Sequence, residues 1–187
     1  RWTGPQIFNQ LPEINVICAG IDTTGTMTGL GTYFKEVKPS VLRLGLCATP
    51  GDRVPDLGEL ELMEASNFPW KEAVDTFEEV NSLDSFSLSL ELSRGGIVCG
   101  PSSGSNLKGL LQMLEKRKAA DTLSELRGEG GFIHCVFLCC DLPYQHIDEY
   151  IQKVGDKFSP IKNEVCLSVL YEICSCVCAD SPQQRSQ

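Results

Sequence analysis

Residues 14–36 contain the pattern that most restricts how this chain folds. The apolar run from Ile14 to Ala19 is typical of a buried strand. The turn GIDTTGTMTGLG follows it, and the residues after the turn predict a helix that ends near residue 36. The first N–H groups of a helix have no partner within the helix, so this strand, turn and helix together predict a site for an anion.

The rest of the chain alternates strand and helix patterns in the same way. Residues 49–80 differ, because they are rich in proline, glycine and acidic residues and predict a long excursion. Further strands are predicted at 41–47, 96–100 and, most clearly, 132–140, and further helices at 82–94, 103–118 and after residue 146. The alternation predicts an α/β protein with a mostly parallel sheet and helices on both faces.

Composition and charge exclude several classes of protein. Apolar residues make up 42% of the chain, which is enough to bury a core, and no apolar run is long enough to span a membrane. The net charge of −9 argues against binding to nucleic acid or to an anionic membrane. The chain begins with Arg1 rather than methionine and has no signal peptide, so we expect it to start inside a longer protein.

The chain has ten cysteines, and most of them lie in apolar, strand-like runs. They are Cys18, Cys47, Cys99, Cys135, Cys139, Cys140, Cys166, Cys174, Cys176 and Cys178. Buried free thiols have this distribution, whereas secreted disulfide scaffolds are rich in loops, so we expect a reducing, cytoplasmic setting. The last three could form a metal cluster, but their spacing is tighter than zinc sites use and no histidine lies near, so we expect no metal.

Two strand–turn–helix corners, at residues 20–29 and 99–105, stand out as binding sites. Ligands of open α/β sheets collect at the carboxyl ends of the strands, so both corners are expected to face one site. The simpler alternative is that each corner is only a turn and a helix cap. In that case Ser102 or Ser103 caps the helix at 103–118 and no ligand is needed.

Three segments resemble one known family in order and spacing over residues 2–155. TGPQIFNQL followed by INVICAGIDTTGTMTGLGTYFKE is similar to T-T-G-P-E-I and V-A-G-x-G-T-G-G-T-x-T-G of cysteine synthases and cystathionine β-synthases. GGIVCGPSSGSNLKGL resembles their E-G-I-x-x-G-x-S-S-G, and FIHCVFLCCD their last core strand. This family is the fold type II, tryptophan synthase β-like group of pyridoxal-phosphate enzymes. GDRVP, NFPW and CCDLPYQHIDEY further resemble a fungal branch, in which a rhodanese-like domain sometimes follows.

The resemblance implies a cofactor, pyridoxal 5′-phosphate, and the residues that bind it. Backbone N–H groups of Thr23, Thr24, Gly25 and Thr26, with the hydroxyls of Thr23 and Thr26, would bind its phosphate. Ser102 would face the pyridine nitrogen, and a neutral hydroxyl there leaves that nitrogen unprotonated, which suits β-elimination. Asp141 would lie close to the same site. The implied reaction is β-replacement on serine or O-acetylserine to give cysteine.

The turn departs from the family pattern at two positions. Asp22 and Thr24 stand where G-T-G-G-T has glycines. A threonine forced to positive φ costs about 1–2 kcal/mol. A carboxylate about 4 Å from the phosphate costs at most about 4 kcal/mol at an effective dielectric constant of 20. The turn therefore has the shape of a phosphate site, but its charge opposes a phosphate.

The lysine that the family uses to form a Schiff base with the cofactor has no counterpart in this chain. In the family it lies upstream in an S-x-K-x-R context, and none of the lysines here has that context. The asparagine loop that binds the substrate carboxylate is also missing. We therefore expect residues 1–158 to be the C-terminal part of the cofactor domain, 159–187 to be a divergent tail, and no residue of the chain to be catalytic.

Three functions remain open at this point. The first is part of a β-replacement enzyme, inactive alone, that acts on a small amino acid. The second is a non-catalytic relative that acts as a binding or regulatory partner. The third is a nucleotide-binding module of Rossmann type, which GIDTTG fits poorly because the middle glycine of G-x-G-x-x-G is absent. The resemblance also implies a larger domain built from both ends of the family's chain, so that residues 1–187 alone would leave a sheet edge and an apolar face uncovered. We therefore expect the isolated chain to form a homodimer or to aggregate.

Overall fold

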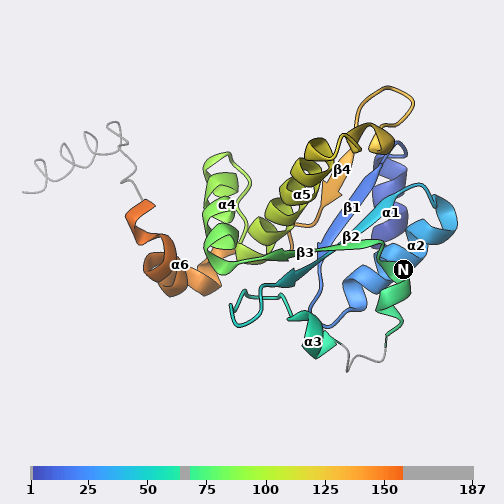
Figure 1. Cartoon of the computed structure of the whole chain (residues 1–187). Helices are drawn as coiled ribbons and strands as arrows, with labels where there is room; N and C mark the ends of the chain where they lie inside the picture. Colours follow the sequence, from blue (N-terminus) through green and yellow to red (C-terminus); the bar gives the residue numbers. More distant parts are fainter. Residues whose placement is uncertain (1, 64–67, 158–187) are drawn as a thin grey trace, which may run out of the picture. The chain divides into compact units, whose positions relative to one another are not determined.

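The computed structural model describes residues 2–63 and 68–157 (Figure 1). The chain divides into two units, residues 1–155 and 156–187, and the fold below belongs to the first of them. The tail predicted at 159–187, with its closely spaced cysteines, lies outside the described residues. Within the described residues, none of the helices combines the length and the apolar character needed to cross a membrane.

Four parallel strands form one sheet in the order β3-β2-β1-β4. The strands are β1 (Val16–Gly20), β2 (Leu42–Ala48), β3 (Thr76–Val80) and β4 (Cys135–Phe137). In the register, Val16 of β1 pairs with Leu42 of β2 and with Cys135 of β4. The predicted α/β class with a parallel sheet is confirmed.

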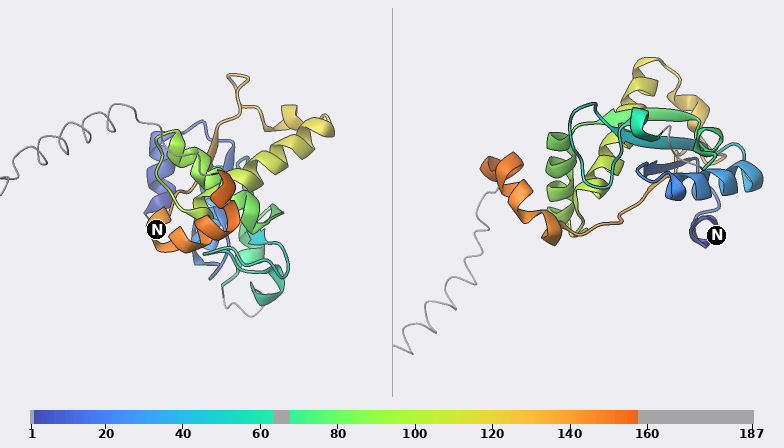
Figure 2. Two further views of the ribbon diagram at one scale, coloured as in Figure 1. Left: turned by 90° about the vertical axis from the view of Figure 1, so that its left-hand side faces the viewer. Right: turned by 90° about the horizontal axis from the view of Figure 1, so that it is seen from below.

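Helices cover both faces of the sheet, as the views in Figure 2 show. Alternate residues of a strand point to opposite faces, so Ile17 and Val16 of β1 belong to different cores. The helices α1 (Thr3–Gln10) and α2 (Gly25–Val37) pack on the Ile17 side. Helix α5 (Pro101–Ala119) packs on the other side through Leu110 and Met113.

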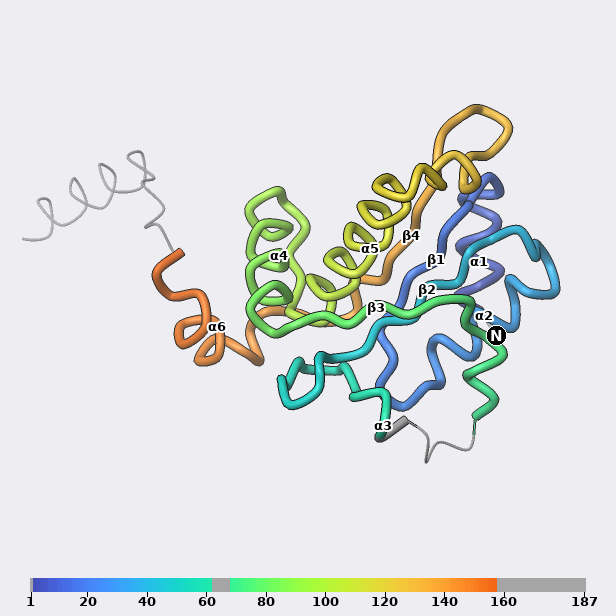
Figure 3. The backbone as a smooth tube through the Cα atoms, viewed as in Figure 1, coloured from blue at the N-terminus to red at the C-terminus, as the bar shows by residue number. Residues whose placement is uncertain are grey.

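The remaining elements are helices and helical turns that lie between the strands or after the last of them in the sequence. They are α3 (Leu60–Met63), η1 (Trp70–Ala73), α4 (Ser82–Arg94), η2 (Leu123–Leu126), η3 (Pro143–His146), α6 (Ile147–Val154) and η4 (Gly155–Lys157). Helices α4 and α5 pack closely at Gly104, where a Cβ atom would collide with the carbonyl oxygen of Ser85. Phe86 of α4 packs against Tyr150 and Val154 of α6 in a separate small core. The tube in Figure 3 shows the path of the chain through these elements.

Three predicted segments differ from the structure. The excursion at 49–80 contains strand β3, which was missed because its Glu78 and Glu79 do not look like strand residues. Glu78 is nevertheless buried, and its carboxylate accepts a hydrogen bond from Lys116 at 2.7 Å. The strand predicted at 96–100 is absent, because Gly96 has φ = 96° and the apolar Ile97 is 51% exposed.

The strand predicted at 132–140 is reduced to the three residues of β4, and they are only half-buried. At its start, the N–H of His134 donates to the side chain of Asn15. After its end, the carbonyl of Leu138 accepts from the side chain of Asn106 on α5. Side chains therefore supply hydrogen bonds at both ends, although the carbonyl of His134 still accepts the backbone N–H groups of Asn15 and Val16, and a strand pattern alone does not reveal this.

Candidate functional site

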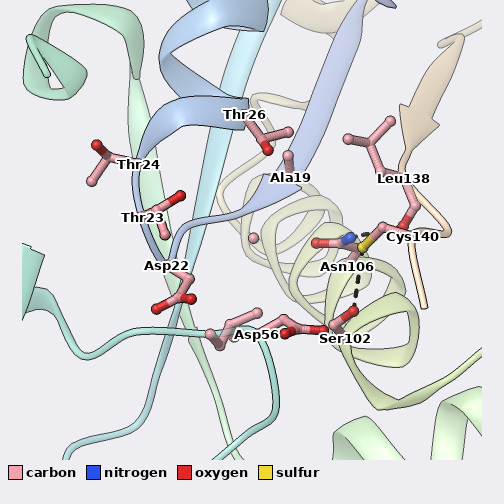
Figure 4. A pocket seen from close by; sticks show the side chains of 12 residues that line it. Ala19, Asp22, Thr23, Thr24, Thr26, Asp56, Ser102, Asn106, Leu138 and Cys140 are labelled. Carbon is pink, nitrogen blue, oxygen red and sulfur yellow. Dashed lines mark hydrogen bonds between the residues drawn. The ribbon is translucent and has the colours of Figure 1, made fainter. Parts of the chain in front are cut away.

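A cavity of about 240 Å³ lies at the carboxyl ends of β1 and β4, where the sheet meets the first turns of α2 and α5 (Figure 4). Its lining residues come from four separate segments of the chain. They are Ala19, Gly20, Asp22, Thr23, Thr24, Thr26, Asp56, Leu57, Ser102, Asn106, Leu138 and Cys140. The two corners predicted from the sequence thus face one cavity.

The turn after β1 leads into α2 through a left-handed residue. Thr24 precedes the helix with φ = 66°, a conformation that costs a threonine about 1–2 kcal/mol. The carbonyl of Thr24 accepts the N–H of Thr28 at 2.9 Å and so closes the first helical turn. The helix has no side-chain cap, and among the described residues none accepts a hydrogen bond from the N–H of Gly25 or Thr26. The start of α2 can therefore receive an anion.

The residues predicted to bind the cofactor are brought to this cavity with one exception. Thr23, Thr24, Thr26 and Ser102 line it. Gly25 is the first residue of α2 and lines a neighbouring hollow beside Tyr33 instead. The prediction for Gly25 concerns its backbone N–H group, since glycine has no side chain that could line the cavity. The roles of the five residues in cofactor binding stay predictions.

Helix α5 is capped by a residue from another part of the chain. It begins at Pro101 after Gly100, not at residue 103, and no serine side chain caps it. Instead, the carboxylate of Asp141 accepts the N–H of Ser102 at 2.8 Å, the N–H of Ser103 at 3.1 Å and the hydroxyl of Ser103. The alternative in which Ser102 or Ser103 caps the helix is therefore wrong.

Gly100 makes room for that carboxylate. A Cβ atom at position 100 would collide with Oδ2 of Asp141, and the N–H of Gly100 donates to the carbonyl of Asp141 at 3.1 Å. The segment after β4 is therefore fixed directly against the start of α5. This contact holds Cys140 beside Ser102, with 3.3 Å between Sγ and Oγ.

Asn106, one turn after Ser102 on α5, is a cavity residue that the sequence did not identify. It is buried, and its Nδ2 donates to the carbonyl of Leu138 at 2.8 Å. Its Oδ1 is buried without a hydrogen-bond partner among the described residues. An asparagine inside a helix carries no motif, and only the packing of α5 against β4 places it in the cavity.

Two thiols near the cavity, those of Cys99 and Cys139, are not activated nucleophiles. Burial raises the pKa of Cys99 to about 11, and burial also raises the pKa of Cys139. Both thiols therefore stay protonated at neutral pH, and it is the thiolate that reacts and binds metals. The six cysteines of the described residues are all free, and these residues contain no group of three side chains suited to hold a metal.

The charge of the cavity opposes an anion. Asp22 and Asp56 both line it and are exposed, and Asp56, with φ = 55°, was not identified from the sequence. No lysine, arginine or histidine occurs among the described residues that line the cavity. Exposure and salt screen the two carboxylates, so each opposes a phosphate by less than the roughly 4 kcal/mol of an unscreened pair.

The cavity has hydrogen-bonding groups that suit pyridoxal phosphate. Open N–H groups at α2 suit the phosphate, and the hydroxyl of Ser102 suits a polar group of the ring. Gly20 lets the side chain of Leu57 pack against the end of β1, because a Cβ there would lie 2.6 Å from Cδ1 of Leu57. Figure 4 shows Thr23 and Thr26 across the cavity from Ser102 and Asn106.

Known proteins with similar sequences are cysteine synthases. Cysteine synthase B of Salmonella typhimurium is 29% identical over 130 residues, which cover 68% of this chain and 43% of that protein. Cysteine synthase B of Escherichia coli has the same identity and coverage. Cysteine synthase B of Pseudomonas aeruginosa is 28% identical over 113 residues, which cover 59% of this chain and 38% of that protein.

Two solved structures of enzymes have a similar fold. O-acetyl serine sulfhydrylase isoform 3 from Entamoeba histolytica has a TM-score of 0.58 and 18% identity, over 82% of this chain and 45% of that chain. A hydrogen sulfide-producing enzyme from Fusobacterium nucleatum has a TM-score of 0.61 and 18% identity, over 77% of this chain and 48% of that chain. At such identities the likeness establishes the fold.

The sequence profile of one family matches most of the chain. The family is described as "Pyridoxal-phosphate dependent enzyme", and the match covers residues 1–125, which include β1, the turn before α2 and Ser102. The chain spans about two fifths of the length of the curated relatives named above. Because this profile matches residues 1–125, the chain belongs to the pyridoxal-phosphate dependent enzyme family.

Proposed function

We propose that this chain binds pyridoxal 5′-phosphate in the cavity between α2 and α5, as part of an enzyme of cysteine synthase type. Such an enzyme would replace the β-substituent of serine or O-acetylserine. The observation that carries the proposal is the open start of α2, where the N–H groups of Gly25 and Thr26 have no acceptor among the described residues. The named relatives are cysteine synthases, which supports this reaction class.

The phosphate would bind at the first turn of α2. The N–H groups there point to the cavity end of the helix, and the partial positive charge of a helix start favours an anion. Thr23 and Thr26 line the same place and supply hydroxyl donors. No cationic side chain lines the cavity among the described residues, so the backbone carries this interaction.

The ring would lie between β1 and α5. The cavity of about 240 Å³ is smaller than most sites for small molecules, which measure roughly 300–1,000 Å³, and so suits a ligand with a single ring. Ser102 and Asn106 are its polar groups on the α5 side. When bound, the cofactor supplies the electron-withdrawing ring that this class of reaction needs.

The chain alone would bind the cofactor without catalysis. The described lining of the cavity contains no lysine to bond the cofactor covalently. We propose that this lysine and the groups that bind the substrate come from a part of the enzyme outside residues 1–187. The homodimer expected from the sequence stays a prediction, and so does the cytoplasmic location.

Binding to the purified chain tests this proposal. Pyridoxine 5′-phosphate is the probe, because it has no aldehyde and cannot react with surface lysines. We expect calorimetry to show binding to this probe at one site, competition by inorganic phosphate, and much weaker binding of pyridoxine, which has no phosphate. Thr26→Val should weaken binding of the phosphorylated probe several-fold, because one hydroxyl donor is lost.

The matched control is Thr32→Val, which changes an exposed threonine on the same helix outside the cavity. It should leave the affinity unchanged. The proposal is wrong if pyridoxine binds as well as its phosphate, or if the two valine variants behave alike. Reduction with borohydride in the presence of pyridoxal phosphate should trap no specific adduct, whereas a single modified lysine of this chain would contradict the assignment of the covalent link.

A second function, a non-catalytic relative that serves as a binding partner, is favoured by the two acidic residues of the cavity. Asp22 and Asp56 oppose a phosphate, and Thr24 is strained where glycine would be relaxed. This alternative predicts that the unaltered chain fails to bind the phosphorylated probe even at millimolar concentration. Binding that is regained by Asp22→Gly together with Thr24→Gly would support it.

A further inference from the structure

A second cavity lies at the opposite edge of the sheet from the cavity between α2 and α5. Its volume is about 580 Å³, within the roughly 300–1,000 Å³ of sites for small molecules. Its lining residues are Pro12, Glu13, Asn15, Lys38, Ser40, Glu125, Leu126, Arg127, Gly128, Glu129, Gly130 and His134. Asn15 and His134 directly precede β1 and β4, so this cavity lies where those parallel strands begin. Figure 1 shows the loop between α5 and β4 at this end of the sheet.

The side chain of Asn15 presents a hydrogen-bond donor to the second cavity. Its Oδ1 accepts the backbone N–H of His134 at 2.8 Å, which fixes the direction of the amide group. Its Nδ2 has no hydrogen-bond partner among the described residues and is not one of their buried unpaired atoms, so it is open to solvent. The three atoms nearest to a Cβ at position 128 would all belong to this amide group, with Nδ2 closest at 3.1 Å. Gly128 therefore leaves the donor uncovered on that side.

Lys38 adds a positive charge that is held in place. Its Nζ donates to the carbonyl of Pro12 at 2.8 Å and to the carbonyl of Ile14 at 2.9 Å. Both carbonyls are neutral and an ammonium group has three donors, so the full charge and one donor remain for a ligand. Within residues 2–63 and 68–157, no carboxylate forms an ion pair with Lys38. A cation that is already positioned loses little freedom when it binds an anionic group.

The walls of the second cavity also carry unpaired charges of both signs. The guanidinium of Arg127 and the carboxylates of Glu13 and Glu129 are exposed, and they form no ion pair in the part of the chain that the structure describes. Glu125 differ from them, because it pairs with an arginine outside the cavity at 3.4 Å. Together with Lys38, the cavity thus offers positive and negative groups that do not neutralise one another.

The two cavities differ in the charge of the ligand that they suit. The described lining of the cavity between α2 and α5 has acids and no cation. In the second cavity, a ligand with a single charge would meet groups of the same sign as well as groups of the opposite sign. A small zwitterion, which carries a carboxylate and an ammonium group close together, matches both kinds of group.

We propose that the second cavity binds a free α-amino acid, with its carboxylate on Lys38 and Asn15 and its ammonium group on Glu13 or Glu129. The inference goes beyond the proposed function and does not rest on it, because no residue lines both cavities. The charged groups are exposed and therefore screened by salt, so we expect a dissociation constant on the order of 1 mM.

The experiment compares three probes on the purified chain labelled with ¹⁵N. L-alanine carries both charges, propanoate lacks the ammonium group, and ethylamine lacks the carboxylate. We expect L-alanine at low salt to shift the amide signals of Gly128 and Gly130, which line the cavity. Propanoate and ethylamine should each bind about tenfold more weakly, because each loses one set of charge-assisted hydrogen bonds. Saturating pyridoxine 5′-phosphate should leave the affinity for L-alanine unchanged.

Asn15→Asp tests the carboxylate end of the site. The variant keeps the acceptor for the N–H of His134 and replaces the donor Nδ2 by a charged oxygen, so the local structure is retained. We expect L-alanine to bind about tenfold more weakly. Gln145→Glu is the matched control, because it turns an exposed amide outside the cavity into an acid, and it should leave the affinity unchanged. Urea unfolding shows whether each variant keeps its stability.

The double variant Glu13→Gln, Glu129→Gln tests the ammonium end. Both side chains are exposed and unpaired, so the fold should be unaffected. We expect the variant to bind L-alanine no more tightly than propanoate, because the groups that hold the ammonium are lost. A preference for L-alanine that persists in this variant would contradict the assignment of the two acids.

The remaining outcomes separate this inference from the proposed function. Equal affinities of the unaltered chain for L-alanine and propanoate would show a general anion site and overturn the inference. An unchanged affinity of Asn15→Asp for L-alanine would overturn it too, as would competition between L-alanine and pyridoxine 5′-phosphate. If L-alanine binds as expected while pyridoxine 5′-phosphate does not bind at all, the inference stands and the proposed function fails.

Discussion

Two helices begin at the edge of the same cavity, and their first turns differ in what they bind. At the start of α5, the carboxylate of Asp141 accepts two backbone N–H groups and a hydroxyl. At the start of α2, the N–H groups of Gly25 and Thr26 have no acceptor among the described residues. One helix start is occupied by an anion of the chain itself, and the other is open to an anion from outside.

Helix α4 belongs with α5 in this comparison. The N–H of its first residue, Ser82, donates to the carboxylate of Asp52 at 2.6 Å, and its N-cap Asn81 accepts from Asp84. A helix start therefore marks a binding site only where the chain does not supply its own acceptor. Of these three helix starts, that of α2 has a strained residue, Thr24 at positive φ, and backbone N–H groups without an acceptor among the described residues.

The largest expected effect comes from opening the start of α5. Asp141→Ala removes the acceptor of two N–H groups and one hydroxyl in a partly buried place. We expect the free energy of unfolding to fall by about 3 kcal/mol, measured by urea denaturation. The control is Asp148→Ala, which removes an exposed acid in the first turn of α6 and should cost less than about 0.5 kcal/mol. If both variants lose the same free energy of unfolding, Asp141 stabilises the start of α5 no more than an exposed acid stabilises a helix.

The next effect is a gain in stability at the open helix start. Thr24→Gly relieves a left-handed threonine, and we expect about 1 kcal/mol of additional stability after the greater chain entropy of glycine is included. Thr23→Gly is the control, because φ of Thr23 is not positive and glycine there should destabilise by roughly 0.5–1 kcal/mol. Thermal unfolding of both variants measures the difference. Destabilisation by Thr24→Gly would mean that contacts of the threonine outweigh its strain.

A smaller effect concerns the charge beside α2. Asp22→Asn removes one carboxylate from the cavity, and we expect inorganic phosphate to bind about threefold more tightly at low salt. The gain should fade above about 0.5 M salt, where charges are screened. Asp121→Asn, an exposed acid outside the cavity, should have no effect on phosphate binding. An unchanged affinity in Asp22→Asn would mean that this carboxylate points away from the anion.

The smallest effect is the pH dependence of the cap on α4. Burial alone would raise the pKa of Asp52, but the hydrogen bonds from Ser82 and the charge of Lys153 hold it below its ordinary value of 3.8. A lowered pKa in the folded state means that this stabilisation is present above pH 3.8 and is lost as the pH falls through the folded value. In Asp52→Asn, unfolding free energy should therefore fall less between about pH 5 and pH 2 than in the unaltered chain.

The local parts of the fold were predictable from the sequence. The apolar run and turn of residues 14–36 predicted β1 and α2 to within a few residues, because each depends on nearby side chains. Helix α4 was predicted within the same margin. Strand β3 was missed, since its Glu78 is tolerated in the interior only through the distant Lys116.

The cavity was predictable in its position but not in its chemistry. Strands of a parallel sheet end at one edge, so the two corners were expected to meet, and Ser102 lies where that reasoning placed it. Asn106 and Asp56 were missed, because no motif marks them and only the packing of distant segments brings them to the cavity. The cap on α5 was misassigned to the nearest serines, because a local pattern does not reveal an acceptor 39 residues away.

Strand β1 lies between β2, which follows it closely in the sequence, and β4, which is the last of the four strands. Val16 pairs with Leu42 on one side and with Cys135 on the other. Closing the longer loop costs about 1 kcal/mol more chain entropy than closing the shorter one. During synthesis, the pair β1–β2 can form while β4 is still inside the ribosome, and one edge of the central strand stays unpaired until then. We therefore expect this edge to be the surface that chaperones shield in the nascent chain.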